Sequence, residues 1–142
     1  GSHEAAARFP SFITNDLIGK GIRSIEIFVY NVPQSFSFNV YSGGSAAGPG
    51  AQIFSEEVSS QMIANSANLI TFDNPIPING EIWLSASWSQ KDTEQVIGCD
   101  AGPANPNGDW LYLSSDSDEW TSFRDRSAES VNWNIRGILT DL

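Results

Sequence analysis

The residue types that enzymes most often use as nucleophile and base are scarce in this chain of 142 residues, which holds one histidine, His3, and one cysteine, Cys99. A serine or cysteine nucleophile needs a neighbouring base, and a zinc site needs several thiolates or imidazoles. With a single thiol and a single imidazole at the third position, neither chemistry is expected, and no intrachain disulfide can form. A carboxylate pair could serve a glycosidase, but with 17 acidic residues chance neighbours are common. We therefore predict that the protein is not an enzyme.

Oxygen ligands for a metal ion are crowded in the second half of the chain. Calcium binds about six to eight oxygen atoms, mostly from carboxylates and from the backbone carbonyls of loops. The candidate ligands are Asp100, Asp109, Asp116, Asp118 and Glu119. Their spacing lacks the glycine and the distal glutamate of an EF-hand loop. We predict a structural calcium ion here as the one cofactor. The alternatives are a solvated turn at residues 116–119, a turn-capping carboxylate at Asp100, and neutralisation by Arg124 and Arg126.

Five tryptophans and three tyrosines offer contacts for a sugar. Aromatic rings combine an apolar face with a polar edge, and nearby amides and carboxylates can hold sugar hydroxyls. Trp88 and Trp133 share their strand phase with aliphatic residues, so we expect both in the core. The rings on the opposite phase or beside the acidic loops are the candidate ligand contacts: Trp83, Trp110, Tyr112 and Tyr41. The alternative for these four is that they cover the sheet and are themselves partly buried.

The elements that must position these side chains are strands. Apolar residues alternate with polar ones, the period of a half-buried strand, over residues 25–29, 36–40, 82–88 and 131–139. Shorter strands are predicted at residues 52–58, 68–72, 95–99 and 109–113. The first two long runs are expected to form a meander or hairpin, and Pro75 and Pro77 mark an edge strand or crossover. No stretch shows a capped helical stripe. The prediction is an all-β, jelly-roll-like antiparallel β-sandwich.

The length of the chain fits one domain with a core of its own. Hydrophobic residues make up 40% and aromatic residues 11% of the chain, which excludes a disordered protein. The segment Gly1-Ser2-His3 resembles the remnant of a cleaved tag, and the alanine-rich residues after it resemble a linker. We therefore expect residues 1–8 to be a tag or linker remnant and residues 9–142 to be the β-sandwich domain.

The charge of the chain excludes some classes of partner. The formal net charge is −10, with only seven basic residues. Nucleic-acid binding depends on basic residues that contact phosphates, and anionic membranes attract basic surfaces in the same way. The chain also lacks the run of roughly 20 apolar residues that a membrane helix needs. Nucleic acid and membrane insertion are therefore not expected, whereas divalent cations and neutral ligands such as sugars remain open.

A series of short motifs follows in a recognisable order and spacing in the second half. It comprises IPINGEIW at 76–83, IGCDAGP at 97–103, Gly108-Asp109-Trp110, Trp120, and NWNIR at 132–136. This series resembles a β-sandwich accessory module of secreted, Bacteroidetes-type proteins. Such modules accompany peptidases, adhesins and the haemagglutinin-like regions of gingipain-type proteases. The resemblance implies a secreted or cell-surface location and a place within a larger multidomain polypeptide.

These observations predict a non-catalytic binding module whose partner is a glycan or a protein surface. Carbohydrate is favoured because aromatic residues and loops rich in Asn, Asp and Ser cluster in the second half. The alternative is a protein-interaction domain, or a structural spacer or adhesin domain, attached to a secreted peptidase or another enzyme. The exposure of Trp83, Trp110 and Tyr112 distinguishes the two: exposed coplanar rings favour carbohydrate, and full burial favours the spacer.

Overall fold

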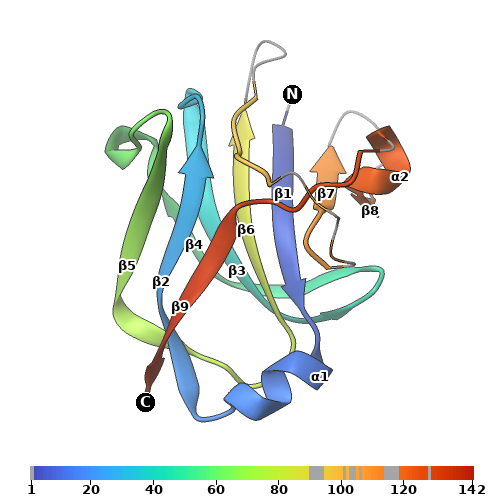
Figure 1. Cartoon of the computed structure of the whole chain (residues 1–142). Helices are drawn as coiled ribbons and strands as arrows, with labels where there is room; N and C mark the ends of the chain where they lie inside the picture. Colours follow the sequence, from blue (N-terminus) through green and yellow to red (C-terminus); the bar gives the residue numbers. More distant parts are fainter. Residues whose placement is uncertain are drawn as a thin grey trace.

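The computed structural model describes residues 2–89, 95–100, 102, 105, 107–113, 119–127 and 129–142. These residues form two antiparallel sheets that pack face to face (Figure 1). One sheet has six strands in the order β4-β3-β6-β1-β7-β8, and the other has three in the order β5-β2-β9. The prediction of an all-β antiparallel sandwich is confirmed.

The strands and helices have the following bounds. The six-stranded sheet contains β4 (Gly48–Glu57), β3 (Ser35–Ser45), β6 (Ile82–Ser89), β1 (Ser2–Phe9), β7 (Trp110–Leu113) and β8 (Trp120–Ser122). The three-stranded sheet contains β5 (Ser66–Pro77), β2 (Lys20–Val29) and β9 (Ile135–Asp141). Two short helices, which the sequence did not predict, are α1 (Ser11–Thr14) and α2 (Phe123–Ser127). In the described residues no helix is long and apolar enough to cross a membrane.

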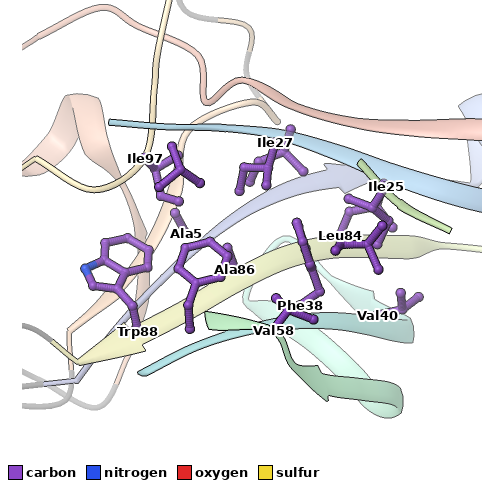
Figure 2. Packing of buried hydrophobic residues seen from close by; sticks show 14 of the residues in the cluster. Ala5, Ile25, Ile27, Phe38, Val40, Val58, Leu84, Ala86, Trp88 and Ile97 are labelled. Carbon is purple, nitrogen blue, oxygen red and sulfur yellow. The ribbon is translucent and has the colours of Figure 1, made fainter. Parts of the chain in front are cut away.

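The core lies between the sheets and is built by the alternating runs. Phe38 of β3 and Leu84 and Ala86 of β6 face Ile25 and Ile27 of β2, and all five side chains are buried (Figure 2). Period-two alternation places one apolar side chain in every two on the same face of a strand. Removing these side chains from water is the main favourable contribution to folding.

The expected hairpin between the first two long runs is wrong. Strand β2 belongs to the three-stranded sheet, whereas β3 pairs with β4 and β6 in the six-stranded sheet. Residues 30–34 cross between the sheets, and Pro33 cannot donate a ladder hydrogen bond there. The apolar faces of β2 and β3 line the same core from opposite sides, so their phase alone cannot identify their pairing partners.

The first residues of the chain lie inside the fold rather than beside it. We expected residues 1–8 to be a tag or linker remnant, but residues 2–9 form β1, which pairs with both β6 and β7. Ala5, Ala6 and Ala7 are all buried. Alanine gives no contrast between an apolar and a polar face, and its small side chain is typical of helices and linkers as well. In the described structure, strand pairing therefore begins at Ser2.

Two further segments differ from the expectation for them. The final strand begins at Ile135 rather than at residue 131. Residues 95–99 form no named strand but make two isolated bridges, Val29 with Ile97 and Cys99 with Trp133. By contrast, the edge position indicated by the two prolines of residues 75–77 is confirmed, because β5 is the outermost strand of its sheet.

Candidate functional site

Aromatic side chains gather on the outer face of the six-stranded sheet, the face turned away from the core. They come from four strands that the ladder places next to or near one another. The register pairs Tyr41 with Trp83, Tyr112 with Trp120, and Ala6 of β1 with Trp110. We call this set the aromatic face; its members are Tyr41, Trp83, Trp110, Tyr112 and Trp120. The sequence identified four of the five and missed Trp120, because β8 has only three residues and shows no usable alternation.

The rings of the aromatic face contact one another at an angle. The ring centroids of Trp83 and Trp110 are 5.2 Å apart with planes inclined by 53°. Those of Trp83 and Trp120 are 5.6 Å apart at 67°, and those of Tyr112 and Trp120 are 5.6 Å apart at 40°. These separations are within the range of favourable aromatic pairs. Trp110, Tyr112, Trp120 and Tyr41 are half-buried.

Trp83 lies beneath the other rings. We expected it to be an exposed ligand contact, but its exposed fraction is 0%, so the expected exposure is wrong. Its phase, opposite to the core residues of β6, was predicted correctly. It is buried because Trp110 and Trp120 pack against its ring, and neither β7 nor β8 could be paired with β6 from the sequence.

A fixed set of polar contacts holds the Trp83 ring in place. Its Nε1 donates to Glu81 Oε2 at 2.8 Å. Arg8 donates to the same carboxylate through Nε at 3.2 Å and Nη2 at 3.0 Å. Partial burial alone would raise the pKa of Glu81, but the hydrogen bonds from Arg8 and Trp83 and the charge of Arg8 outweigh it and lower that pKa. Glu81 is therefore held as a carboxylate that orients the central ring.

A row of polar side chains runs along the same sheet face beside the aromatic rings. Tyr41 Oη donates to Glu4 Oε2 at 2.7 Å, and Ser85 Oγ donates to the same oxygen. Asn39 Nδ2 lies 3.2 Å from Ser85 Oγ and 3.0 Å from Ser87 Oγ. We call Glu4, Asn39, Tyr41, Ser85 and Ser87 the polar row. Burial raises the pKa of Glu4 more than its three hydrogen bonds lower it. Burial, followed by the charge of Glu4, also raises the pKa of Tyr41.

The end of the β3–β4 hairpin reaches the aromatic face. A Cβ atom at Gly48 would lie 3.2 Å from Trp120 Cδ1. Figure 1 shows the hairpin sweeping toward β7 and β8. The glycines of residues 43–50 suit this closed turn: Gly44 has a φ of +115°, and a Cβ at Gly50 would lie 2.3 Å from the Ser42 carbonyl oxygen. Residues 43–50 thus form one wall of the aromatic face.

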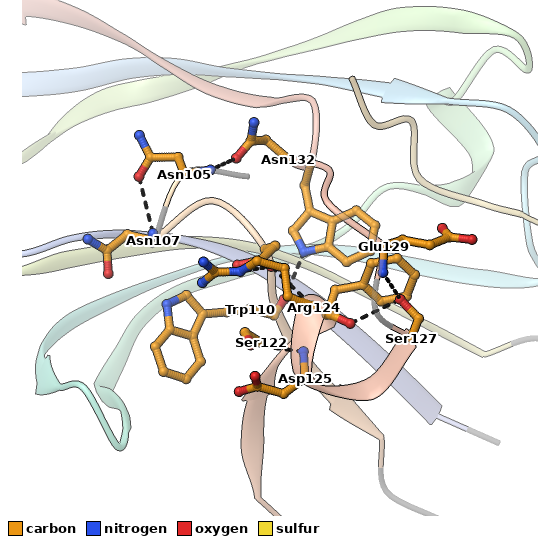
Figure 3. A network of polar contacts seen from close by, with 12 residues as sticks. Asn105, Asn107, Trp110, Ser122, Arg124, Asp125, Ser127, Glu129 and Asn132 are labelled. Atoms are coloured by element: carbon orange, nitrogen blue, oxygen red, sulfur yellow. Dashed lines mark hydrogen bonds and ion pairs between the residues drawn. The ribbon is translucent and has the colours of Figure 1, made fainter. Parts of the chain in front are cut away.

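The loop before β7 is tied to the chain before β9 by hydrogen bonds (Figure 3). Asn107 N donates to Asn105 Oδ1 at 3.2 Å, and Asn105 N donates to Asn132 Oδ1. Trp133 Nε1 donates to the Trp110 carbonyl oxygen at 2.9 Å. Trp133 itself is half-buried and packs against the core, as expected. This network fixes the backbone from which Trp110 projects onto the aromatic face.

Two of the predicted calcium ligands are engaged by protein donors. Asp109 has an exposed fraction of 0%, and its Oδ2 accepts from Arg124 Nε at 2.8 Å. Asp100 Oδ1 accepts from Gly102 N at 2.9 Å and from Asn132 N at 3.0 Å. Hydrogen bonds from the Gly102 backbone and the Asn132 side chain lower the pKa of Asp100. Asp100 therefore caps a turn, as in the first alternative to a calcium ligand. Asp109 is neutralised by Arg124, as in the alternative that invokes the arginines.

The other predicted calcium ligands are less well defined by the structure. Glu119 is exposed, and Asp116 and Asp118 lie outside the described residues. Within the described residues, no three His, Cys, Asp or Glu side chains are grouped so that they could hold a metal ion. The calcium site therefore stays a prediction.

A cavity of about 310 Å³ opens between the sheets beside α1. Its lining is almost wholly apolar and includes Leu17, Ile22, Leu84 and Leu139. Thr14 also lines it, and the buried Oγ1 of Thr14 has no hydrogen-bond partner among the described residues. This cavity offers few groups that could orient a polar ligand, so the aromatic face is the stronger candidate site.

Comparison with known proteins supports the fold. No family model matches the chain, and no curated protein sequence matches it. The structure is similar to a crystal structure of the cysteine protease and lectin-like domains of Cwp84, a surface layer associated protein of Clostridium difficile, with a TM-score of 0.63 and 12% sequence identity. The similarity covers 99% of this chain and 32% of that chain, so the chain spans about a third of the length of its structural relative.

Proposed function

We propose that the protein is a non-catalytic, carbohydrate-binding module of a secreted or cell-surface protein, and that the aromatic face is its binding site. One observation carries this proposal. The half-buried rings of Trp110, Tyr112 and Trp120 lie on one sheet face beside the polar row. Trp83 is buried and the Tyr112 and Trp120 rings are inclined by 40°, so the criterion of exposed coplanar rings is met only by the partial exposure of Trp110 and Tyr112. Sugars present apolar C–H faces and polar hydroxyl edges, so a site for them needs rings and hydrogen-bonding groups side by side.

The setting proposed for the module has two supports. The motif series of residues 76–136 resembles accessory modules of secreted Bacteroidetes-type proteins. The matched solved chain contains a lectin-like domain and a cysteine protease domain of a surface layer associated protein. The two agree on an accessory module that accompanies a peptidase or another enzyme in a larger polypeptide. The absence of catalysis is part of the proposal. His3 and Cys99 line one pocket, but burial raises the pKa of the Cys99 thiol, which disfavours the thiolate that a nucleophile requires.

The test is glycan binding by variants of the aromatic face. The chain would be screened on a glycan array, and the affinity of the best ligand would be measured by isothermal titration calorimetry. Trp110→Ala and Tyr112→Ala should each weaken binding at least about tenfold, which corresponds to ~1.4 kcal/mol and is within the range for a lost ring contact. Phe12→Ala is the matched control, because Phe12 is an aromatic side chain in α1 with an exposed fraction of 75%.

The stability of each variant must be known before its affinity is interpreted. Urea unfolding of the three variants identifies those that fail to fold. Unchanged affinity in folded Trp110→Ala and Tyr112→Ala would contradict the proposed site. A complete lack of glycan binding by the unmodified chain would contradict the proposed function.

A protein-contact role is the second candidate, favoured by a different surface. Around α1 three apolar side chains are exposed: Phe12 by 75%, Ile18 by 55% and Ile13 by 40%. Exposed apolar side chains that are grouped together are typical of protein interfaces. A domain that docks onto a neighbouring enzyme through this surface would lose that contact in Phe12→Ala and keep it in Trp110→Ala, the reverse of the pattern expected for glycan binding.

A further inference from the structure

We infer that the aromatic face binds a single, soluble chain of neutral sugars and does not bind the flat surface of an insoluble polysaccharide. This inference rests on the proposed function and specifies its ligand. It follows from the inclination of the rings, the relief of the surface around them and the charges beside them.

The inclination of the Tyr112 and Trp120 rings disfavours a flat ligand. A crystalline polysaccharide presents many parallel chains in one plane, so rings that stack on it must be coplanar. Tyr112 and Trp120, two of the accessible rings, are inclined to each other by 40°. The pairs inclined by 53° and 67° each include Trp83, which is buried and cannot contact a ligand. Inclined rings instead enclose an angle in which one sugar unit can contact one ring with its face and another with its edge.

The uneven shape of the surface leads to the same conclusion. Trp83 is fully buried at the centre of the aromatic face, so the accessible rings surround it and lie further out from the sheet. On one side the β3–β4 hairpin lies against Trp120 through Gly48. The residues at the hairpin end, Ser45, Ala46 and Ala47, are exposed. A rigid flat surface would meet this hairpin, whereas a flexible single chain can pass beside it.

The polar groups within reach of such a chain match hydroxyls. Ser87 of the polar row is half-buried, and Gln52 and Ser55 on the neighbouring strand β4 are exposed. Ser55 Oγ donates to Asn39 Oδ1 at 2.8 Å, and Gln52 Nε2 lies 3.4 Å from Tyr41 Oη, which joins both side chains to the polar row. Hydroxyl and amide groups both donate and accept hydrogen bonds, as sugar hydroxyls do.

The charges beside the rings disfavour an acidic glycan. Glu4 lies in the polar row, and Glu119 is exposed next to Trp120. The guanidinium of Arg8 is engaged by Glu81. Uronic acid or sulfate groups would therefore approach carboxylates on a chain whose net charge is −10. A neutral glycan meets no such repulsion.

The experiment compares three forms of ligand with the same chain at ~0.15 M salt, so that distant charges are screened as in physiological buffer. The soluble neutral probes are cellohexaose, xylohexaose, mannohexaose, chitohexaose and the neutral members of a glycan array. The insoluble probes are microcrystalline cellulose and crystalline chitin, measured by sedimentation. The anionic probes are polygalacturonate and heparin, measured by affinity electrophoresis. Trp110→Ala is the site variant, and Phe12→Ala is its control.

We expect the chain to bind a soluble neutral probe, and we expect Trp110→Ala to weaken that affinity at least tenfold. Sedimentation with the insoluble polymers should remove no protein from solution. Adsorption to cellulose or chitin that no soluble oligosaccharide displaces would overturn the inference and leave the proposed function standing. Preferential binding of polygalacturonate or heparin would do the same. Failure of every probe, including the whole array, would overturn the inference together with the proposed function.

Discussion

Two carboxylates on the outer face of the six-stranded sheet have opposite surroundings. Glu81 accepts hydrogen bonds from Arg8 and from the indole of Trp83, and its pKa is lowered. Glu4 is surrounded by neutral donors, among them Tyr41 and Ser85, and burial raises its pKa. A cation beside a carboxylate favours its charged form, whereas burial without a cation disfavours it. The two residues should therefore have opposite effects on stability as the pH changes.

The pH dependence of Glu4→Gln and Glu81→Gln tests this difference. The folded state binds the Glu4 proton more tightly than the unfolded chain, whose pKa is near the ordinary 4.5. Ionised Glu4 therefore costs stability at neutral pH, and this cost disappears as the pH falls through the raised folded pKa. The stabilisation from Glu81 is complete above 4.5 and is lost as the pH falls through its lowered folded pKa.

Urea unfolding of the parent chain and of both variants between pH 3 and pH 8 gives the measurement. Relative to Glu4→Gln, the parent should gain stability as the pH falls from neutral. Relative to Glu81→Gln, it should lose stability below about pH 4.5. Parallel pH profiles for the two differences would contradict the assigned surroundings.

Trp83 shows how far sequence reasoning reaches at the scale of one side chain. Its alternation with Leu84 was enough to place it on the outer face. Its burial depends on Trp110 and Trp120, which lie 27 and 37 positions further along the chain and reach it only after β7 and β8 have paired. Spacing within one strand carries no information about such partners. Neutralisation of the acidic loops by Arg124 and Arg126 was one alternative to calcium, but only the 2.8 Å contact shows that Arg124 engages Asp109.

At the scale of elements, strands with two unlike faces were predictable and the others were not. Strands β3 and β6 alternate clearly because one face lines the core and the other is polar. Strand β1 was not predicted because its buried centre is a run of three alanines, which shows no alternation of apolar and polar residues. Strand pairing could not be predicted from the sequence either, because even the consecutive strands β2 and β3 lie in different sheets. Local pattern fixes which way a side chain points, whereas pairing is decided by the packing of the whole sandwich.

The position of β1 leads to a prediction about the start of the chain. It lies between β6 and β7, so its removal would leave both strands with unpaired backbone groups and would expose the core beside Ala5. A variant that lacks residues 1–8 should therefore show no cooperative unfolding transition in urea. A variant that lacks only residues 1 and 2 is the control and should unfold close to the parent midpoint. An unchanged midpoint in the longer deletion would mean that this segment is the tag remnant that the sequence indicated.

At the scale of the whole molecule, the acidic charge is the dominant feature. The formal net charge is −10, and several carboxylates of the second half lie within residues 100–119. Arg124 offsets Asp109, and backbone and amide donors stabilise Asp100. No equivalent contact is described for Glu119, which is exposed. Repulsion among carboxylates held close together disfavours the folded state unless a cation or bound water relieves it.

The calcium prediction follows from this balance and is tested by thermal unfolding. An ion that binds only the folded state stabilises it by about 2.7 kcal/mol at a concentration ~100 times its dissociation constant, which raises the melting temperature by several degrees. We expect calcium to raise the melting temperature, a chelator to lower it, and magnesium to have less effect because it requires a tighter octahedral site. Since Asp100 and Asp109 are already engaged by protein donors, the calcium shift should survive Asp100→Asn and vanish in the double variant Asp116→Asn, Asp118→Asn.

A calcium-induced shift in melting temperature that survives the double variant would instead assign the ion to Asp100 or Asp109, which would then lose their present contacts. Identical melting curves with calcium, magnesium and chelator would exclude the ion and leave Arg124 and solvent to balance the acidic loops.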